Sequence, residues 1–185
     1  GITLLYTRRS RGIEEIRLLR PDKIVETTYR NIGLATTWGL SGSLRFNNNK
    51  LNIGTTVVVR HLSLTSPALG LTNQGFMATV DLNTSYRFKK GFSVESFIYV
   101  ESGSIALQQK RSWYLFYNLL VSKKMLKDKL NLTIRADGFF DPWFYRSWKI
   151  DTPSLFQENT YRSINRYLRL AISYKFGKQD IRTPV

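Results

Sequence analysis

The chain has 185 residues, no cysteine, a single histidine and a net charge of +15. Without cysteine, neither a disulfide scaffold nor a cysteine-based metal site can form, and one histidine argues against a histidine-based metal centre or a Ser-His-Asp triad. The length suits one ordinary domain or a barrel of roughly eight strands.

The composition is aromatic but not strongly apolar. Aromatic residues make up 14% of the chain, yet the mean hydropathy is only -0.26, which favours half-polar strands and aromatic belts over an apolar globular core. The best apolar run, residues 112–122, is shorter than the ~18 residues that a spanning helix needs. Because the chain opens directly in strand-like ITLLY, we expect it to be processed or cut from a longer polypeptide.

The positive charge first suggests a nucleic-acid partner, since Lys and Arg neutralise phosphates. Many of the basic residues, however, sit one by one on polar strand faces or near turns. That distribution favours solvated or lumenal positions, with outer-membrane lipid and lipopolysaccharide phosphates as anionic partners rather than nucleic acid.

The N-terminal quarter is expected to be extended. Residues 2–6 begin a strand that continues through a basic segment toward Ile16, and a turn is predicted at residues 20–22, where Pro and Asp are turn formers. Residues 24–46 form the next extended stretch, with a bulge or break at residues 31–33.

The rest of the chain alternates apolar and polar residues, which is strand periodicity. The clearest case is the last strand, where every second residue from Leu168 to Phe176 is apolar. Short turns are predicted at 47–50, 89–91 and 123–128, and long loops at 8–22, 61–75, 102–110 and 139–158.

No segment follows the 3.6-residue spacing of an amphipathic helix, so no helix is predicted that could cover an apolar sheet face. Each strand alone would also suit a soluble antiparallel sandwich. The series of strands with alternating short and long connections is instead typical of an outer-membrane barrel, with short turns in the periplasm and long loops outside. The predicted fold is all-β, an antiparallel up-and-down transmembrane β-barrel of about eight strands over residues 1–177, followed by a short C-terminal tail, 178–185.

Five segments carry a resemblance to a known family: YRNIGLATTWGLSGSLRF (29–46), NNKLNIG (48–54), NTSYRFKKGFSVE (83–95), KKMLKDKLNLTIRADGFF (123–140) and LRLAISYKFGK (168–178). In order and spacing they resemble the C-terminal barrel region of the TonB-dependent-receptor-like outer membrane β-barrel family of Bacteroidota-type bacteria. The resemblance implies a bacterial outer-membrane location, a barrel of about 22 strands filled by a plug, and uptake energised through TonB. The plug and the remaining strands would lie upstream, and a surface lipoprotein or other assembly subunits are implied as partners.

The inferred lumen face is rich in positive charge. An eight-stranded barrel has an interior just filled by side chains, so a surplus of one sign is easier to hold beside water or an acidic plug. This favours a slice of a wide barrel, with a self-contained eight-stranded barrel as the alternative. The inferred lumen-facing charges are Arg45, Arg60, Asp81, Arg87, Arg135, Asp137 and Arg169.

An aromatic cluster precedes the last strand: Phe139, Phe140, Trp143, Phe144, Tyr145 and Trp148. These side chains could stack on sugars or aromatic ligands, or they could form an aromatic girdle with loop packing at the outer interface. No nucleophile–base pair, carboxylate dyad or phosphate-binding glycine loop is present in the sequence, and His61 is expected to be an ordinary interface residue. We therefore expect no catalytic, cofactor or metal site.

Two functions follow from this pattern. The first is a barrel of a TonB-dependent receptor or transporter that takes up a substrate. The second is a non-transporting structural barrel subunit of an outer-membrane protein assembly. A plug with a TonB-contacting segment upstream would distinguish the first from the second.

Overall fold

The computed structural model describes residues 1–176, so the predicted tail, 178–185, lies outside the described residues. Apart from two short 3-10 turns, η1 (Pro67–Leu69) and η2 (Lys89–Gly91), every regular element in this range is a strand, which confirms the all-β fold. The strands are β1 (Ile2–Leu19), β2 (Val25–Asn47), β3 (Leu51–Ser66), β4 (Leu71–Arg87), β5 (Phe92–Glu101), β6 (Ser104–Ile105), β7 (Gln109–Arg111), β8 (Tyr114–Met125), β9 (Leu130–Asp137), β10 (Trp143–Thr152), β11 (Leu155–Ile164) and β12 (Tyr167–Tyr174).

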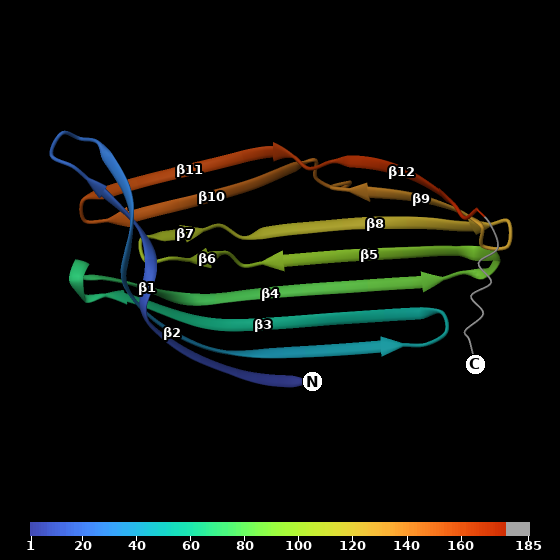
Figure 1. The fold of residues 1–185 in the computed structure, drawn as a ribbon, viewed down its shortest axis with the longest axis horizontal. Helices are drawn as coiled ribbons and strands as arrows, with labels where there is room; N and C mark the ends of the chain where they lie inside the picture. Colours follow the sequence, from blue (N-terminus) through green and yellow to red (C-terminus); the bar gives the residue numbers. More distant parts are fainter. Residues whose placement is uncertain (177–185) are drawn as a thin grey trace.

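The strands form two antiparallel sheets. The larger has eight strands in the order β1-β2-β3-β4-β5-β8-β9-β12, and the smaller has four in the order β11-β10-β7-β6. Strands that pair in the small sheet continue strands that pair in the large sheet. The β6–β7 pair continues the β5–β8 pair, and the β10–β11 pair continues the β9–β12 pair. The small sheet thus continues four strands of the large one beyond a short interruption, as Figure 1 shows.

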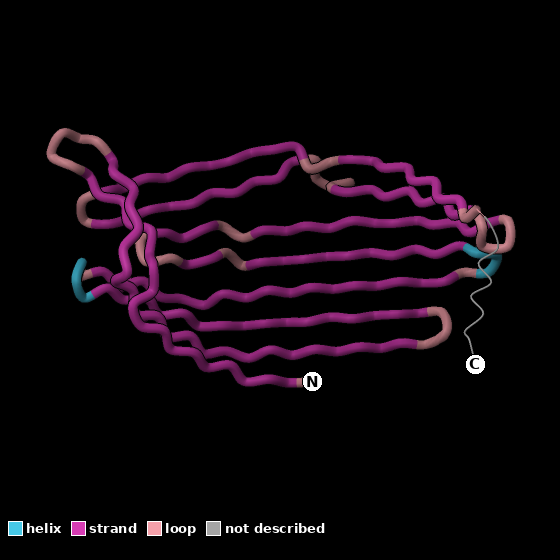
Figure 2. The backbone as a smooth tube through the Cα atoms, in the orientation of Figure 1, coloured by secondary structure: helices cyan, strands magenta, loops and turns pink. Residues whose placement is uncertain are grey.

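The expected long loops are wrong. Strands occupy most of residues 8–22, 61–75 and 139–158, and the short strands β6 and β7 occupy part of residues 102–110, so that only short connections remain, as Figure 2 shows. Beyond the apolar part of each strand both faces carry polar residues, so the alternation disappears while ladder hydrogen bonds to neighbouring strands still hold the backbone extended. Loss of the pattern therefore marks the end of the apolar band and not the end of the strand.

The two faces of the large sheet differ in character. One row of cross-strand neighbours is Gly42, Val57, Val80, Val100 and Leu115, and the same face exposes Leu4 by 84% and Leu168 by 76%. We call it the apolar face. A row of the opposite, polar face is Arg45, Gly54, Asn83, Phe97, Asn118, Asp137 and Tyr167. An uncovered apolar face of this extent is stable against lipid and not against water.

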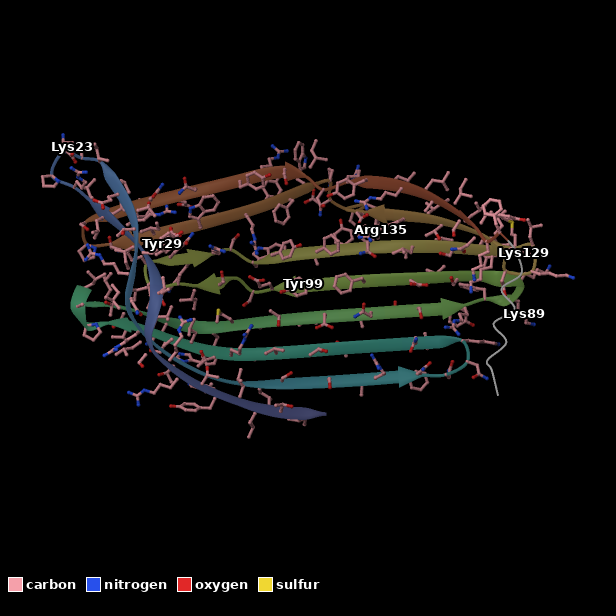
Figure 3. All side chains as sticks on the ribbon, in the orientation of Figure 1. Lys23, Tyr29, Lys89, Tyr99, Lys129 and Arg135 are labelled. Atoms are coloured by element: carbon pink, nitrogen blue, oxygen red, sulfur yellow. The ribbon has the colours of Figure 1, made fainter. Side chains whose placement is uncertain are left out.

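The first hairpin bends sharply. The register between β1 and β2 shifts between Arg9 and Gly12 and again between Gly12 and Ile13, opposite residues 31–33, and Arg11 has a positive φ of 55°. The predicted bulge at 31–33 is therefore confirmed. Beyond the bend, the outer half of the hairpin crosses the other strands, with Lys23 at its tip (Figures 1 and 3).

The outer half of this hairpin packs on the polar face. Ile16 is fully buried among Ala35, Leu64 and Leu107, and Ala35 and Leu64 are cross-strand neighbours two places from the Thr37–Leu62 pair of that face. We call residues 13–31 the crossing hairpin. No helix in residues 1–176 is long and apolar enough to cross a membrane.

Candidate functional site

All seven predicted lumen-facing charges lie on the polar face. The strand register establishes this, because cross-strand neighbours point to the same face of a sheet. The neighbours are Arg45 with Gly54 and Gly54 with Asn83, Arg60 with Gly39, Asp81 with Thr56, Arg87 with Ser93, and Arg135 with Arg169. The Arg135–Asp137 pair is the only ion pair among the seven within residues 1–176. Arg45, Arg87 and Arg169 are exposed on the polar face and make no ion pair within residues 1–176.

Asp137 is the most deeply buried of these charges, with 1% of its surface exposed. It accepts three hydrogen bonds from the Arg135 guanidinium, at 2.7, 2.9 and 3.0 Å. The bidentate geometry is the strong form of an Arg–carboxylate pair. Asn118, its cross-strand neighbour, is also buried, and Arg135, which Figure 3 labels, lies on the same face of the sheet.

A polar cavity of about 490 Å³ opens on the same face near the short-turn end of the sheet. Its lining includes Arg45, Asn52, Asn83, Glu95 and Asn118. Side chains of this kind can hydrogen-bond water, a polar solute or the surface of another domain. No group of three or more His, Asp or Glu side chains within the described part of the chain could hold a metal ion.

The predicted aromatic cluster is split by the structure. Phe139 and Phe140 pack on Tyr117, with ring centroids 5.1 and 5.6 Å away, and the backbone N–H groups of Phe140 and Asp141 donate to the Tyr117 hydroxyl. Alternation along β10 then separates the other four residues: Trp143 and Tyr145 on one face, Phe144 and Trp148 on the other.

The two faces of β10 meet different partners. The Arg162 guanidinium lies over Trp143 at 3.5 Å and near Tyr145 at 5.5 Å. Phe144 instead packs edge-on against Tyr114, 5.2 Å between centroids, on the polar face. Trp143, Phe144 and Tyr145 nevertheless line one cavity of about 330 Å³, whereas Phe139, Phe140 and Trp148 do not line it.

Sequence reasoning missed two groups of residues. On the apolar face, His61 stacks on Trp38, and Phe76 packs edge-on against both, at centroid distances of 4.9 to 5.7 Å, so His61 belongs to a group of packed aromatic rings. On the polar face, Arg146 lies 3.6 Å from Glu101 and 5.0 Å from the centre of the Tyr114 ring. The alignment of His61 with Trp38 across the hairpin turn at 48–50 was available from the sequence, whereas the position of Arg146 depends on the interruption at 138–142.

An antiparallel sheet with one lipid-compatible face and one charged face is the wall of an outer-membrane β-barrel. A family model described as "Outer membrane protein beta-barrel family" matches residues 2–174, and the chain belongs to this family. It is accordingly a protein of the bacterial outer membrane. No curated protein and no solved structure matches the chain.

Proposed function

We propose that the chain forms part of the barrel of a TonB-dependent receptor or transporter, which takes up a substrate across the outer membrane. The proposal rests on one observation: the large sheet has two unpaired edges, and its polar face is basic. In the eight-stranded sheet β1 pairs only with β2 and β12 only with β9. Unpaired strand edges are not stable in hydrocarbon, so a membrane barrel needs further strands at both edges or closure of one edge on the other.

The charge on the polar face supports the wide barrel over closure. Closing eight strands would confine Arg45, Arg87 and Arg169 to an interior filled by side chains, although no ion pair involves them within residues 1–176. A water-filled lumen or an acidic plug surface accommodates them without that desolvation. The proposal requires a plug and further strands as partners. It is also compatible with a surface lipoprotein or other assembly subunits.

Lipopolysaccharide is the proposed lipid partner. Arg162 lies over Trp143 and Tyr145 on the face of β10 that turns away from the polar face. Aromatic rings at an interface with a basic group beside them suit the level of phosphate-bearing headgroups.

The proposed role is non-enzymatic. The single histidine is stacked on Trp38 at 5.2 Å on the apolar face, away from the carboxylates of the polar face. A general base there would have no aqueous substrate to act on.

The test compares cells of the native host with the gene deleted and restored. Uptake across the outer membrane is followed for a panel of nutrients, with and without a protonophore that dissipates the inner-membrane gradient. Energised uptake of at least one nutrient, lost on deletion and abolished by the protonophore, is the expected result. Uptake that is insensitive to the protonophore would indicate a passive pore, and unchanged uptake would favour a structural barrel subunit.

A further inference from the structure

The wall of the barrel is interrupted between β8 and β10. The pairing of β8 with β9 ends at Asn118 and Asp137, and the pairing of β7 with β10 ends at Arg111 and Trp148. Between these two points, residues 114–117 pair with β5 on one side and with no strand on the other, and Figure 1 shows β10 diverging from β8 there. The wall therefore contains an internal gap with a strand edge beside it.

A cavity of about 330 Å³ occupies this gap. Its size lies at the lower end of the range of ligand sites, roughly 300 to 1,000 Å³. Leu115 and Tyr117 line it from the apolar face, and Glu158 and Thr160 line it from β11. The cavity has six aromatic rings in its lining, those of Trp113, Tyr114, Tyr117, Trp143, Phe144 and Tyr145.

The gap requires an occupant that can form hydrogen bonds. The edge of β8 that faces β10 has no strand partner over residues 114–117. Unpaired backbone groups are not stable beside hydrocarbon, so an acyl chain in the cavity would leave them unsatisfied. Hydroxyl groups can both donate to backbone carbonyls and accept from backbone N–H groups, so a polyhydroxy molecule meets this requirement.

The charges around the cavity disfavour an anion. Asp141 and Glu158 belong to the lining, whereas no Lys or Arg of the described residues does. Glu158 is exposed and makes no ion pair within residues 1–176. Its carboxylate repels an anionic ligand and accepts hydrogen bonds from hydroxyl groups.

An organic cation is disfavoured as well, because guanidinium groups already lie over two of the rings. Arg146 is 5.0 Å from the centre of the Tyr114 ring, and Arg162 is 3.5 Å from that of Trp143. The lining therefore suits an uncharged molecule that has hydroxyl groups and a flat C–H face, and a pyranose ring has both.

We propose that this cavity binds an uncharged sugar ring. The ring packs against the aromatic side chains, and its hydroxyl groups hydrogen-bond to Glu158 and to the unpaired edge of β8. Such a ring is carried by the headgroup of a glycolipid or by a free saccharide. The inference goes beyond the proposed uptake, because Leu115 and Tyr117 place the cavity on the apolar face and not on the lumen side.

The test uses the full-length protein in micelles of a sugar-free detergent and has two arms. In the first arm, methyl glucoside is titrated by calorimetry. In the second arm, glucosyl diacylglycerol is added, and its retention is measured by native mass spectrometry against diacylglycerol without the sugar. We expect saturable binding of methyl glucoside with a Kd on the order of 1 mM if a free saccharide is sufficient. Retention of the glucosyl lipid without binding of methyl glucoside would assign the site to a glycolipid headgroup.

Three outcomes would overturn the proposal. Equal retention of the two lipids would show that an acyl chain occupies the cavity, and binding of neither sugar probe would show that no sugar does. In the arm that binds, the glucuronic acid form of the probe should bind at least about fivefold more weakly, because of the carboxylates. Equal or tighter binding of that form is the third outcome.

Glu158→Gln should weaken binding of the uncharged probe by roughly fivefold and reduce the preference over the glucuronic acid form. The matched control is Asp151→Asn. Asp151 is an exposed carboxylate two places beyond Lys149, the cross-strand neighbour of Glu158, and it does not line this cavity. Equal losses in the two variants would contradict the site.

Trp113→Leu removes an exposed ring and keeps an apolar side chain. It should weaken binding of the uncharged probe by roughly fivefold, whereas Trp38→Leu, outside the cavity, should leave binding unchanged. Heat-modifiable gel mobility checks folding, and unchanged binding in a folded Trp113→Leu variant would refute the stacking. Binding that persists while energised uptake is absent would refute the transport proposal and leave the site standing.

Discussion

The buried carboxylate of Asp137 makes the stability of the wall depend on one guanidinium. Arg135 supplies its three hydrogen bonds and is itself about one third exposed. Arg135→Gln leaves the carboxylate buried without its counter-charge, so we expect the free energy of unfolding to fall by about 2 to 3 kcal/mol, after allowance for the exposure of Arg135. Urea unfolding in detergent micelles measures this loss.

The matched control is Lys149→Gln. Lys149 pairs with Asp151 at 3.1 Å, but both side chains are about half exposed or more, and surface pairs of this kind contribute about 0 to 1 kcal/mol. A loss in Arg135→Gln no greater than in Lys149→Gln would contradict the account of Asp137.

Single substitutions also distinguish the two faces. Val57 lies between Gly42 and Val80 on the apolar face, and Asn83 lies between Gly54 and Phe97 on the polar face. Val57→Arg should destabilise the folded barrel by roughly 2 to 4 kcal/mol, because it places a charge in lipid, whereas Asn83→Arg should have little effect. The folded fraction in lipid vesicles, read from heat-modifiable mobility, tests this, and equal losses would refute the assignment of the faces.

Sequence alone was sufficient to assign most residues to a face. Strict alternation placed all seven charges on one side, because a strand between two neighbours has no freedom to change parity without a bulge. It gave no assignment for residues 139–149, which were expected to lie in a loop, and the interruption at 138–142 resets which residues of β10 share a side with those of β9. Phe144 and Trp148 were therefore grouped with Trp143 and Tyr145, although the structure separates them.

At the scale of elements, the crossing hairpin depends on Ile16. This side chain is fully buried, whereas Ile13 on the same hairpin is 69% exposed. Ile16→Ala should cost about 3 kcal/mol of packing and loosen the hairpin, and Ile13→Ala should change little. Trypsin added to intact cells, with cleavage at Arg17, Arg20 or Lys23 followed by mass spectrometry, detects the loosening. Equal cleavage in the two variants would show that Ile16 does not hold the hairpin.

The orientation of the barrel in the membrane is inferred from which end of the sheet has the longer strand extensions, since strands occupy the segments predicted as long loops. Strand extensions and the crossing hairpin stand at the end with the turns at 20–24 and 67–70, and this is the end expected outside the cell. A cysteine at Ala68 should therefore react with an impermeant maleimide on intact cells, and one at Asn48 should not. Ala68 is exposed, whereas the neighbouring Ser66 is buried. Labelling at Asn48 alone would reverse the orientation.

The strands, the bulge and the short turns were predictable, because each has a local signal in alternation or in Gly, Pro and Asn placement. The crossing hairpin was not. Its position depends on Ile16 meeting Leu64 and Leu107, contacts between distant parts of the chain that no local pattern specifies. The strand extensions were missed for a related reason, since their pairing partners hold them extended and their own sequence does not alternate.

At the scale of the whole molecule, both long edges of the sheet carry a partner on one side only. In the membrane each edge requires a further strand, and the two edges could in principle satisfy each other by closing a barrel of about eight strands. The basic polar face favours further strands, as in the wide barrel of the proposed transporter.

Disulfide cross-linking of the full-length protein in its membrane separates the two arrangements. Leu5 lies on the polar face of β1, opposite Gly39, and is replaced by cysteine together with Arg169, Ala171 or Ser173 of β12 in turn. Cysteines at Ser122 and Thr133, whose side-chain oxygens are 3.0 Å apart, form the positive control, since a disulfide needs Cα atoms within about 7 Å. We expect the control pair to cross-link and none of the three Leu5 pairs to do so; efficient cross-linking between Leu5 and β12 would show a closed eight-stranded barrel and contradict the open wall.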